Sequence, residues 1–133
     1  MDKTKIMIVD DDLDLRRALK LHLQANHYDT VHASDGSSAI SMAEKERPSL
    51  IILDLSLPSG DGFLVLQWLQ ERDTPSKIPV IVLTAGDPQA SEQKILQAGA
   101  TALFEKPVNS NQLLHAIRAT LPATWSGSAT GPL

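Results

Sequence analysis

Four runs of apolar residues along the chain each stop just before polar side chains with chemical potential. The runs are residues 6–9 before Asp10 and Asp11, 50–53 before Asp54, 80–83 before Thr84, and 102–104 shortly before Lys106 and Pro107. Continuous apolar runs are typical of buried parallel strands, and open α/β sheets bind ligands beyond the carboxyl ends of their strands. The pattern therefore predicts one sheet edge that gathers three carboxylates, a hydroxyl and an ammonium group.

Segments of helical periodicity separate these runs. Residues 13–25 place Leu15, Leu19 and Leu23 on one side with Ala18 beside them, which predicts an amphipathic helix on the sheet, and residues 28–33 predict a further strand. The inward-facing residues of the later helices are predicted to be Ala39, Ile40 and Ala43, then Phe63, Leu66 and Leu69, and finally Leu113, Ile117 and Leu121. Strand and helix alternate five times, so we predict an α/β fold with a doubly wound, five-stranded parallel sheet and helices on both faces.

Local signals predict two helix boundaries. Asn26 and His27 follow the first helix, and we expect one of them to adopt the left-handed conformation that ends it, because both residue types are enriched there. Asn109 with Gln112 three residues later is a capping pattern, so the last helix is predicted to begin there.

Composition narrows the class of protein. The chain has 133 residues, of which 42% are hydrophobic, and a net charge of −4, which suits one domain with a buried core. No apolar run approaches the roughly 20 residues of a membrane span, and no signal peptide precedes the first strand. The absence of cysteine excludes disulfides and thiol catalysis. We expect a cytoplasmic protein without membrane attachment.

Basic residues are few. Arg16, Arg17 and Lys20 form one patch on the first helix, which we interpret as a solvated face. The acidic net charge and the lack of a basic cluster argue against direct nucleic-acid binding.

The charges gathered at the predicted edge indicate a metal. Three carboxylates in close proximity, Asp10, Asp11 and Asp54, repel one another unless a cation lies among them, and their hard oxygen ligands suit Mg²⁺. A phosphoryl group between a carboxylate and that metal leaves oxygens that Lys106 and Thr84 could neutralise. Asp54 is then a candidate nucleophile that forms an aspartyl phosphate.

The order of these motifs resembles the receiver domain of two-component response regulators, the CheY-like family, from about Lys5 to Leu121. The matching motifs are Val9-Asp10-Asp11, Asp54 followed by Pro58 and Asp61-Gly62, Leu83-Thr84-Ala85, Gly99-Ala100 and Lys106-Pro107. The resemblance implies a flavodoxin-like sheet with strand order 2-1-3-4-5. It also implies a cis bond between Lys106 and Pro107.

The resemblance further implies a role for each residue of the site. Asp54 is expected to accept a phosphoryl group from a phosphohistidine of a sensor histidine kinase or of a histidine phosphotransfer protein. Asp10, Asp11, Asp54 and the backbone carbonyl of Ser56 are the expected Mg²⁺ ligands. Lys106 should pair with Asp54 and then with a phosphoryl oxygen, and Thr84 should bind another phosphoryl oxygen and pull its loop inward.

The remaining expectations concern organisation and partners. Residues 1–121 are interpreted as the receiver domain, and residues 122–133, rich in Pro, Ala, Thr, Ser and Gly, as a flexible tail or truncated linker. The signal would pass to a downstream effector protein or to a missing output domain. A homodimer through the face of the fourth and fifth helices is an open alternative to a monomer.

Two departures from the family pattern affect the expected switch. Receivers usually place Tyr or Phe three residues before the strand-end lysine, where this chain has Leu103, and Phe104 cannot replace it because neighbouring strand residues point to opposite faces. We expect signalling through the loop of residues 85–87 and the neighbouring helix face. Ser56 and Gly86, two residues beyond Asp54 and Thr84, offer no side chain to orient water, so we predict slow intrinsic dephosphorylation.

Two other classes of protein share part of this pattern. Haloacid-dehalogenase-like phosphatases also combine an Asp nucleophile with Thr or Ser, Lys and Mg²⁺, but they carry a second Asp where this chain has Ser56, which argues against a turnover enzyme. A degenerate receiver that acts as a constitutive protein-binding module is favoured by Leu103 alone and opposed by the complete set of site residues.

Overall fold

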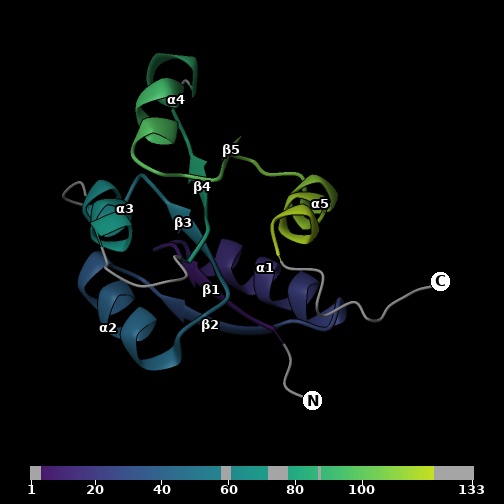
Figure 1. The fold of residues 1–133 in the computed structure, drawn as a ribbon. Helices are drawn as coiled ribbons and strands as arrows, with labels where there is room; N and C mark the ends of the chain where they lie inside the picture. Colours follow the sequence, from purple (N-terminus) through teal and green to yellow (C-terminus); the bar gives the residue numbers. More distant parts are fainter. Residues whose placement is uncertain (1–3, 58–60, 72–77, 87, 122–133) are drawn as a thin grey trace.

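The computed structural model describes residues 4–57, 61–71, 78–86 and 88–121, without the side chains of Asp61 and of residues 88–91. Strands and helices alternate as the sequence predicts (Figure 1). The elements in chain order are β1 (Lys5–Val9), α1 (Leu13–Ala25), β2 (Asp29–Ala33), α2 (Gly36–Glu46), β3 (Leu50–Asp54), α3 (Asp61–Glu71), β4 (Val80–Thr84), α4 (Pro88–Gln97), β5 (Ala102–Glu105) and α5 (Ser110–Thr120).

The strands form one parallel sheet in the order β2-β1-β3-β4-β5, which confirms the predicted fold. Helices α1 and α5 cover one face of this sheet, and α2, α3 and α4 lie on the other side (Figure 1). Every residue of β3 and β4 is buried, because each of these central strands has neighbours on both edges and helices on both faces. The continuous apolar runs in the sequence therefore reflect burial on two sides.

Alternation along each strand divides the core into two layers. In β1, Met7 and Val9 pack in the layer of α2, α3 and α4, whereas Ile6 and Ile8 pack in the layer of α1 and α5. In β5, Leu103 contacts the first layer and Phe104 the second, which confirms that these neighbours point to opposite faces.

The predicted helix boundaries are close to those observed. His27 has φ 72° after α1, and Asn109 caps α5 by accepting a hydrogen bond from the Gln112 N–H at 3.0 Å. Arg47 also adopts a left-handed conformation, φ 48°, at the end of α2, which the sequence analysis did not predict.

Two predictions about helix faces need correction. Ala18 is exposed, so the buried stripe of α1 is narrower than predicted and centres on Leu19 and Leu23. In α5, Leu114 is buried together with Leu113 and Ile117, whereas Leu121 is the C-cap beyond the helix and packs half-buried against the same layer.

Candidate functional site

Three carboxylates meet where β1 and β3 end. Val9 and Leu53 are partners in the parallel register, so Asp10 and Asp54, which follow them, lie side by side. Ligand atoms of Asp10, Asp11 and Asp54 all lie within 4.8 Å of one another. Asp10 and Asp54 are each 1% exposed, while Asp11 is exposed to solvent. The structure thus brings together the three acids that the sequence predicted to meet.

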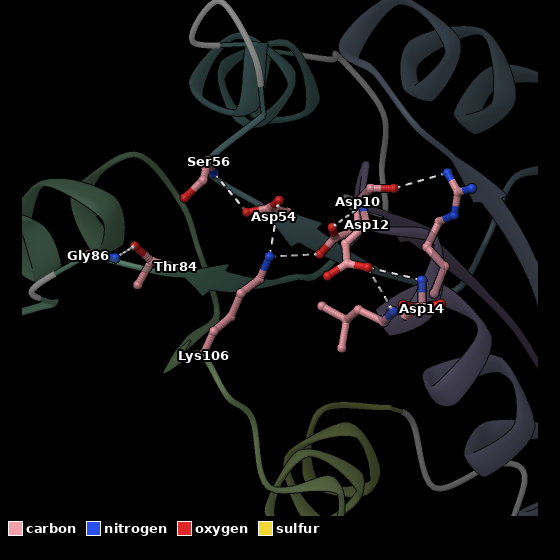
Figure 2. A network of polar contacts seen from close by, with 10 residues as sticks. Asp10, Asp12, Asp14, Asp54, Ser56, Thr84, Gly86 and Lys106 are labelled. Carbon is pink, nitrogen blue, oxygen red and sulfur yellow. Dashed lines mark hydrogen bonds and ion pairs between the residues drawn. The ribbon is translucent and has the colours of Figure 1, made fainter.

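Lys106 enters this cluster from the segment after β5. Its bond to Pro107 is cis, as the family resemblance implies. Its Nζ lies 3.2 Å from Oδ2 of Asp54 and 3.0 Å from Oδ2 of Asp10 (Figure 2). The expected pairing with Asp54 is present, and the second ion pair, with Asp10, was not predicted. One ammonium therefore compensates two buried carboxylates.

Burial and charge shift the pKa values of these groups in a consistent way. Burial raises the pKa of Asp10, and the negative charge of Asp54 adds to this effect, although the Asp12 N–H and Lys106 oppose it. Burial alone would lower the pKa of Lys106, but its contacts with Asp10 and Asp54 outweigh burial and raise this pKa above its usual value. Lys106 is consequently an ammonium at neutral pH.

Backbone N–H groups orient the two buried carboxylates. Asp10 Oδ1 accepts a hydrogen bond from the Asp12 N–H at 2.8 Å, and Asp54 Oδ1 accepts one from the Ser56 N–H at 2.8 Å. The second oxygen of each carboxylate is turned toward Lys106 (Figure 2). Asp12 itself caps α1, since its Oδ1 accepts hydrogen bonds from the Asp14 and Leu15 N–H groups.

The donor set fits a hard divalent cation. Asp10 Oδ2 is buried and has no aligned hydrogen bond within the described part of the chain; its contact with Lys106 is an ion pair only. Three carboxylates against one ammonium leave a net negative charge at a site where Asp11 is open to solvent. Carboxylate oxygens with access to water are the environment that Mg²⁺ prefers.

Thr84 reaches the same edge of the sheet without joining the acids. It is the last residue of β4 and is 8% exposed. Its Oγ1 accepts a hydrogen bond from the Gly86 N–H at 3.2 Å, and Figure 2 shows the side chain beside Gly86 and apart from the Asp54 carboxylate. Thr84 is thus bonded within its own loop in this state.

A close approach of backbones explains one glycine near the site. A Cβ on Gly62, at the start of α3, would lie 2.7 Å from both Cα and O of Leu55, the residue after Asp54. A side chain there would displace the turn that carries the Ser56 N–H. Pro58, the neighbouring motif residue, lies outside the described residues.

Arg16 was not among the predicted site residues. Its Nη1 donates a hydrogen bond to the backbone carbonyl of Asp10 at 3.0 Å. The interpretation of the basic patch as a solvated face holds for Arg17 and Lys20, which are exposed, but is wrong for Arg16. A signal existed in the sequence, since residue 16 lies within the first turns of the helix that follows the acids.

Comparison with known proteins identifies the family. The sequence model of the response regulator receiver domain matches residues 6–118. The chain belongs to the response regulator receiver family. It is 31% identical over 121 residues to the polar-differentiation response regulator DivK of Brucella anthropi, covering 91% of this chain and 98% of that protein.

This receiver is also 38% identical over 120 residues to response regulator MprA of Mycobacterium leprae, covering 90% of this chain and 52% of MprA. It spans about half the length of several such curated relatives. The BeF3-activated N-terminal receiver domain of Klebsiella pneumoniae RstA has a TM-score of 0.78 and 27% identity, with 86% of this chain and 96% of that domain covered.

Membership in the family excludes one of the two alternatives, the phosphatase. Receivers are phosphoacceptor signalling modules that interact with histidine kinases and do not turn over a substrate, so this domain is not a haloacid-dehalogenase-like phosphatase. None of the helices in the described part of the receiver is both long and apolar enough for a transmembrane segment.

Proposed function

We propose that Asp54 is the phosphoacceptor of this receiver. The observation that carries the proposal is the setting of its carboxylate, which is buried at the end of β3, 3.2 Å from the Lys106 ammonium and within 4.8 Å of ligand atoms of Asp10 and Asp11. A buried carboxylate with one ammonium and two further acids suits in-line attack on a phosphorus atom whose charge must be neutralised.

In the proposed reaction, an Asp54 carboxylate oxygen forms a bond to phosphorus while the bond from phosphorus to the donor imidazole breaks. The bonding electron pair leaves with the imidazole nitrogen. Lys106 neutralises one phosphoryl oxygen, and the Ser56 N–H keeps the carboxylate oriented. Asp10, Asp11, Asp54 and the Ser56 carbonyl are the proposed ligands of Mg²⁺, which would supply charge neutralisation for the phosphoryl oxygens.

Thr84 is proposed to bind a further phosphoryl oxygen. Its hydroxyl would have to give up the present contact with the Gly86 N–H, because that contact holds it within its own loop. The exchange would move the segment that leads into α4. Since Leu103 stands in the place of the usual aromatic residue, the output would depend on this loop and on the face of α4, β5 and α5.

The same assignment leads to proposals about the partner proteins and about the limits of the domain. The proposed phosphodonor is a sensor histidine kinase or a histidine phosphotransfer protein in the cytoplasm. Because MprA and other relatives are about twice as long as this chain, we propose an output domain or a separate effector protein as the receiver of the signal. Residues 1–121 would form the domain, with 122–133, outside the described residues, as a linker, and dimerisation would use the α4 and α5 face.

Intact-mass measurement after incubation with Mg²⁺ and acetyl phosphate tests the proposal. The wild type should gain one base-labile phosphoryl group, and Asp54→Asn should gain none. The matched control is Asp12→Asn, which keeps the cap of α1 and should be modified like the wild type. Modification of Asp54→Asn would refute the assignment.

A second probe separates two negative results. The RstA receiver is described as BeF3-activated, and BeF3⁻ with Mg²⁺ should likewise bind here and shift the amide resonances of Thr84 and Gly86. Binding of BeF3⁻ without modification by acetyl phosphate would indicate a strict need for a kinase. Failure to bind either Mg²⁺ or BeF3⁻ would favour a degenerate module that binds proteins constitutively.

A further inference from the structure

Hydrogen bonds hold the backbone of Asp10 on both sides of its Cα atom. The Asp10 N–H donates to the carbonyl of Ala33 at 3.1 Å and so continues the ladder between β1 and β2. The Asp10 carbonyl then leaves the sheet and accepts the hydrogen bond from Arg16 Nη1 at 3.0 Å (Figure 2). Arg16 is therefore attached to the backbone that joins two of the proposed metal ligands.

No other hydrogen bond among the described residues explains why the Arg16 guanidinium lies beside the Asp10 carbonyl. Arg16 Nε is buried and has no hydrogen-bond partner in the described parts of the chain, which costs free energy. Arg17, the next residue on α1, is exposed. Arg16 is half-buried, and among the described residues the Asp10 carbonyl accepts a hydrogen bond from its guanidinium.

The carbonyl contact has a geometric consequence for Asp11. A peptide group is planar, so fixing its oxygen restricts rotation about the bonds on either side of it. Asp11 is exposed, and no hydrogen bond to a described residue holds its carboxylate. The orientation of this peptide therefore fixes where the Asp11 side chain starts, and so whether its carboxylate can reach the ligand atoms of Asp10 and Asp54.

We propose that Arg16 is a positioning residue for the metal site: its hydrogen bond to the Asp10 carbonyl holds the Asp10–Asp11 peptide so that both carboxylates converge with Asp54. The proposal rests on the Mg²⁺ role given to these acids above. Groups that orient metal ligands in this way influence metal affinity without touching the metal.

Charge and position make opposite predictions for Arg16, which makes the proposal easy to test. Removing a positive charge close to a cation site strengthens cation binding if electrostatics dominate. Removing the hydrogen bond that orients the ligands weakens binding. The sign of the change in affinity therefore distinguishes the two roles.

The experiment measures Mn²⁺ affinity by electron paramagnetic resonance on the whole chain, since Mn²⁺ accepts the same oxygen ligands as Mg²⁺. The variants are Arg16→Met, and Arg17→Met as a control that removes the same charge from an exposed neighbour. We expect about tenfold weaker binding for Arg16→Met, as for other residues that orient metal ligands, and unchanged or slightly tighter binding for Arg17→Met.

Unfolding in the absence of metal separates positioning from general support of the fold. Lower thermal stability of Arg16→Met with wild-type Mn²⁺ affinity would overturn the proposal, as would tighter Mn²⁺ binding. Failure of the wild type to bind Mn²⁺ would instead refute the proposed metal site itself.

Arg16→Lys covers the case in which the methionine variant does not fold. A lysine side chain keeps the charge but ends one bond short of the Nη1 position, so it cannot donate from the same place. We expect Mn²⁺ binding several-fold weaker than in the wild type. Wild-type affinity in Arg16→Lys would overturn the proposal.

Discussion

The acidic side of the site and its hydroxyl side are built differently. On the acidic side, Asp10 and Asp54 are 1% exposed and are held by backbone N–H groups and by Lys106. On the hydroxyl side, Thr84 is bonded within its own loop, and β5 next to it has no fully buried residue. The carboxylates and the ammonium proposed for phosphoryl transfer are already together, whereas the proposed role of Thr84 requires its hydroxyl to leave the Gly86 N–H.

The difference between the two sides should be largest in the folding stability that the core beneath each side provides. Leu53, Val82 and Leu103 lie in one row across β3, β4 and β5, and the leucines at both ends contact the same core layer. Leu53 is fully buried and Leu103 is half-buried. We expect Leu53→Ala to lower the free energy of unfolding by about 2–5 kcal/mol, and Leu103→Ala to lower it by about 1–2 kcal/mol.

Urea denaturation of the two alanine variants measures both values. A cost for Leu103→Ala equal to that of Leu53→Ala would show that β5 is as firmly packed as β3, and the proposed contrast between the two sides would fail.

Two glycines allow the same contrast to be drawn in the loops. A Cβ at Gly62 meets Leu55 backbone atoms at 2.7 Å, while at Gly86 the nearest atom is Thr84 Oγ1 at 3.9 Å. Gly62→Ala should lower the free energy of unfolding by about 1–3 kcal/mol because backbone must shift. Gly86→Ala should change it by less than about 0.5 kcal/mol.

Urea denaturation measures the free energies of unfolding of both glycine variants, and amide spectra report any displacement of the turn around Ser56. Equal tolerance of both substitutions would mean that the turn on the acidic side yields as easily as the loop on the hydroxyl side.

The two sides of the site also differ in how much of their structure could be predicted from the sequence. Buried strands leave continuous apolar runs, and parallel strands end at a common edge, so the meeting of Asp10, Asp11 and Asp54 was predictable. Strand order and the cis bond before Pro107 were inferred from resemblance to a family, because spacing along a chain does not determine which strands become neighbours.

Individual side-chain contacts were less accessible from the sequence. The ion pair of Lys106 with Asp10 depends on a distance between strands that are not adjacent in the sheet. The reach of Arg16 to the Asp10 carbonyl depends on the angle at which α1 leaves β1. Both contacts depend on how strands and helices are placed relative to one another, and hydrophobic periodicity does not specify this placement.

The lifetime of the phosphorylated state offers a smaller test of the two sides. Ser56 and Gly86 stand two residues beyond Asp54 and Thr84, and a Cβ added at Gly86 makes an ordinary van der Waals contact with Thr84 Oγ1 at 3.9 Å. A carboxylate or amide there could orient water toward the acyl phosphate. We expect Ser56→Asn and Gly86→Glu each to accelerate dephosphorylation by about tenfold, below the effect of an optimised catalytic group.

Decay of the phosphoryl adduct, followed by intact mass after removal of acetyl phosphate, measures these rates. Gly86→Ala is the matched control and should decay like the wild type. Unchanged decay in both polar variants would contradict the explanation of slow dephosphorylation by Ser56 and Gly86.

The smallest expected effect is on the free energy of unfolding, and it arises from the buried negative charge of Asp10. Burial raises the pKa of Asp10, so its ionised form destabilises the folded, metal-free protein at neutral pH. Asp10→Asn should therefore raise the free energy of unfolding at neutral pH by about 1 kcal/mol, opposite in sign to most substitutions. Asn keeps an oxygen for the Asp12 N–H, and Lys106 keeps Asp54.

The pH dependence gives this last prediction its sign. A raised folded-state pKa means that the wild type gains stability relative to Asp10→Asn as pH falls through that pKa toward the usual value of 3.8. The gap between the two proteins should accordingly close on acidification, and added Mg²⁺ should reverse it by stabilising the wild type alone. Asp29→Asn, at an exposed aspartate, should show neither effect. A destabilised Asp10→Asn in metal-free solution would mean that the ion pair with Lys106 outweighs the burial of the charge, and that the acidic side is held together by attraction without the need for a cation.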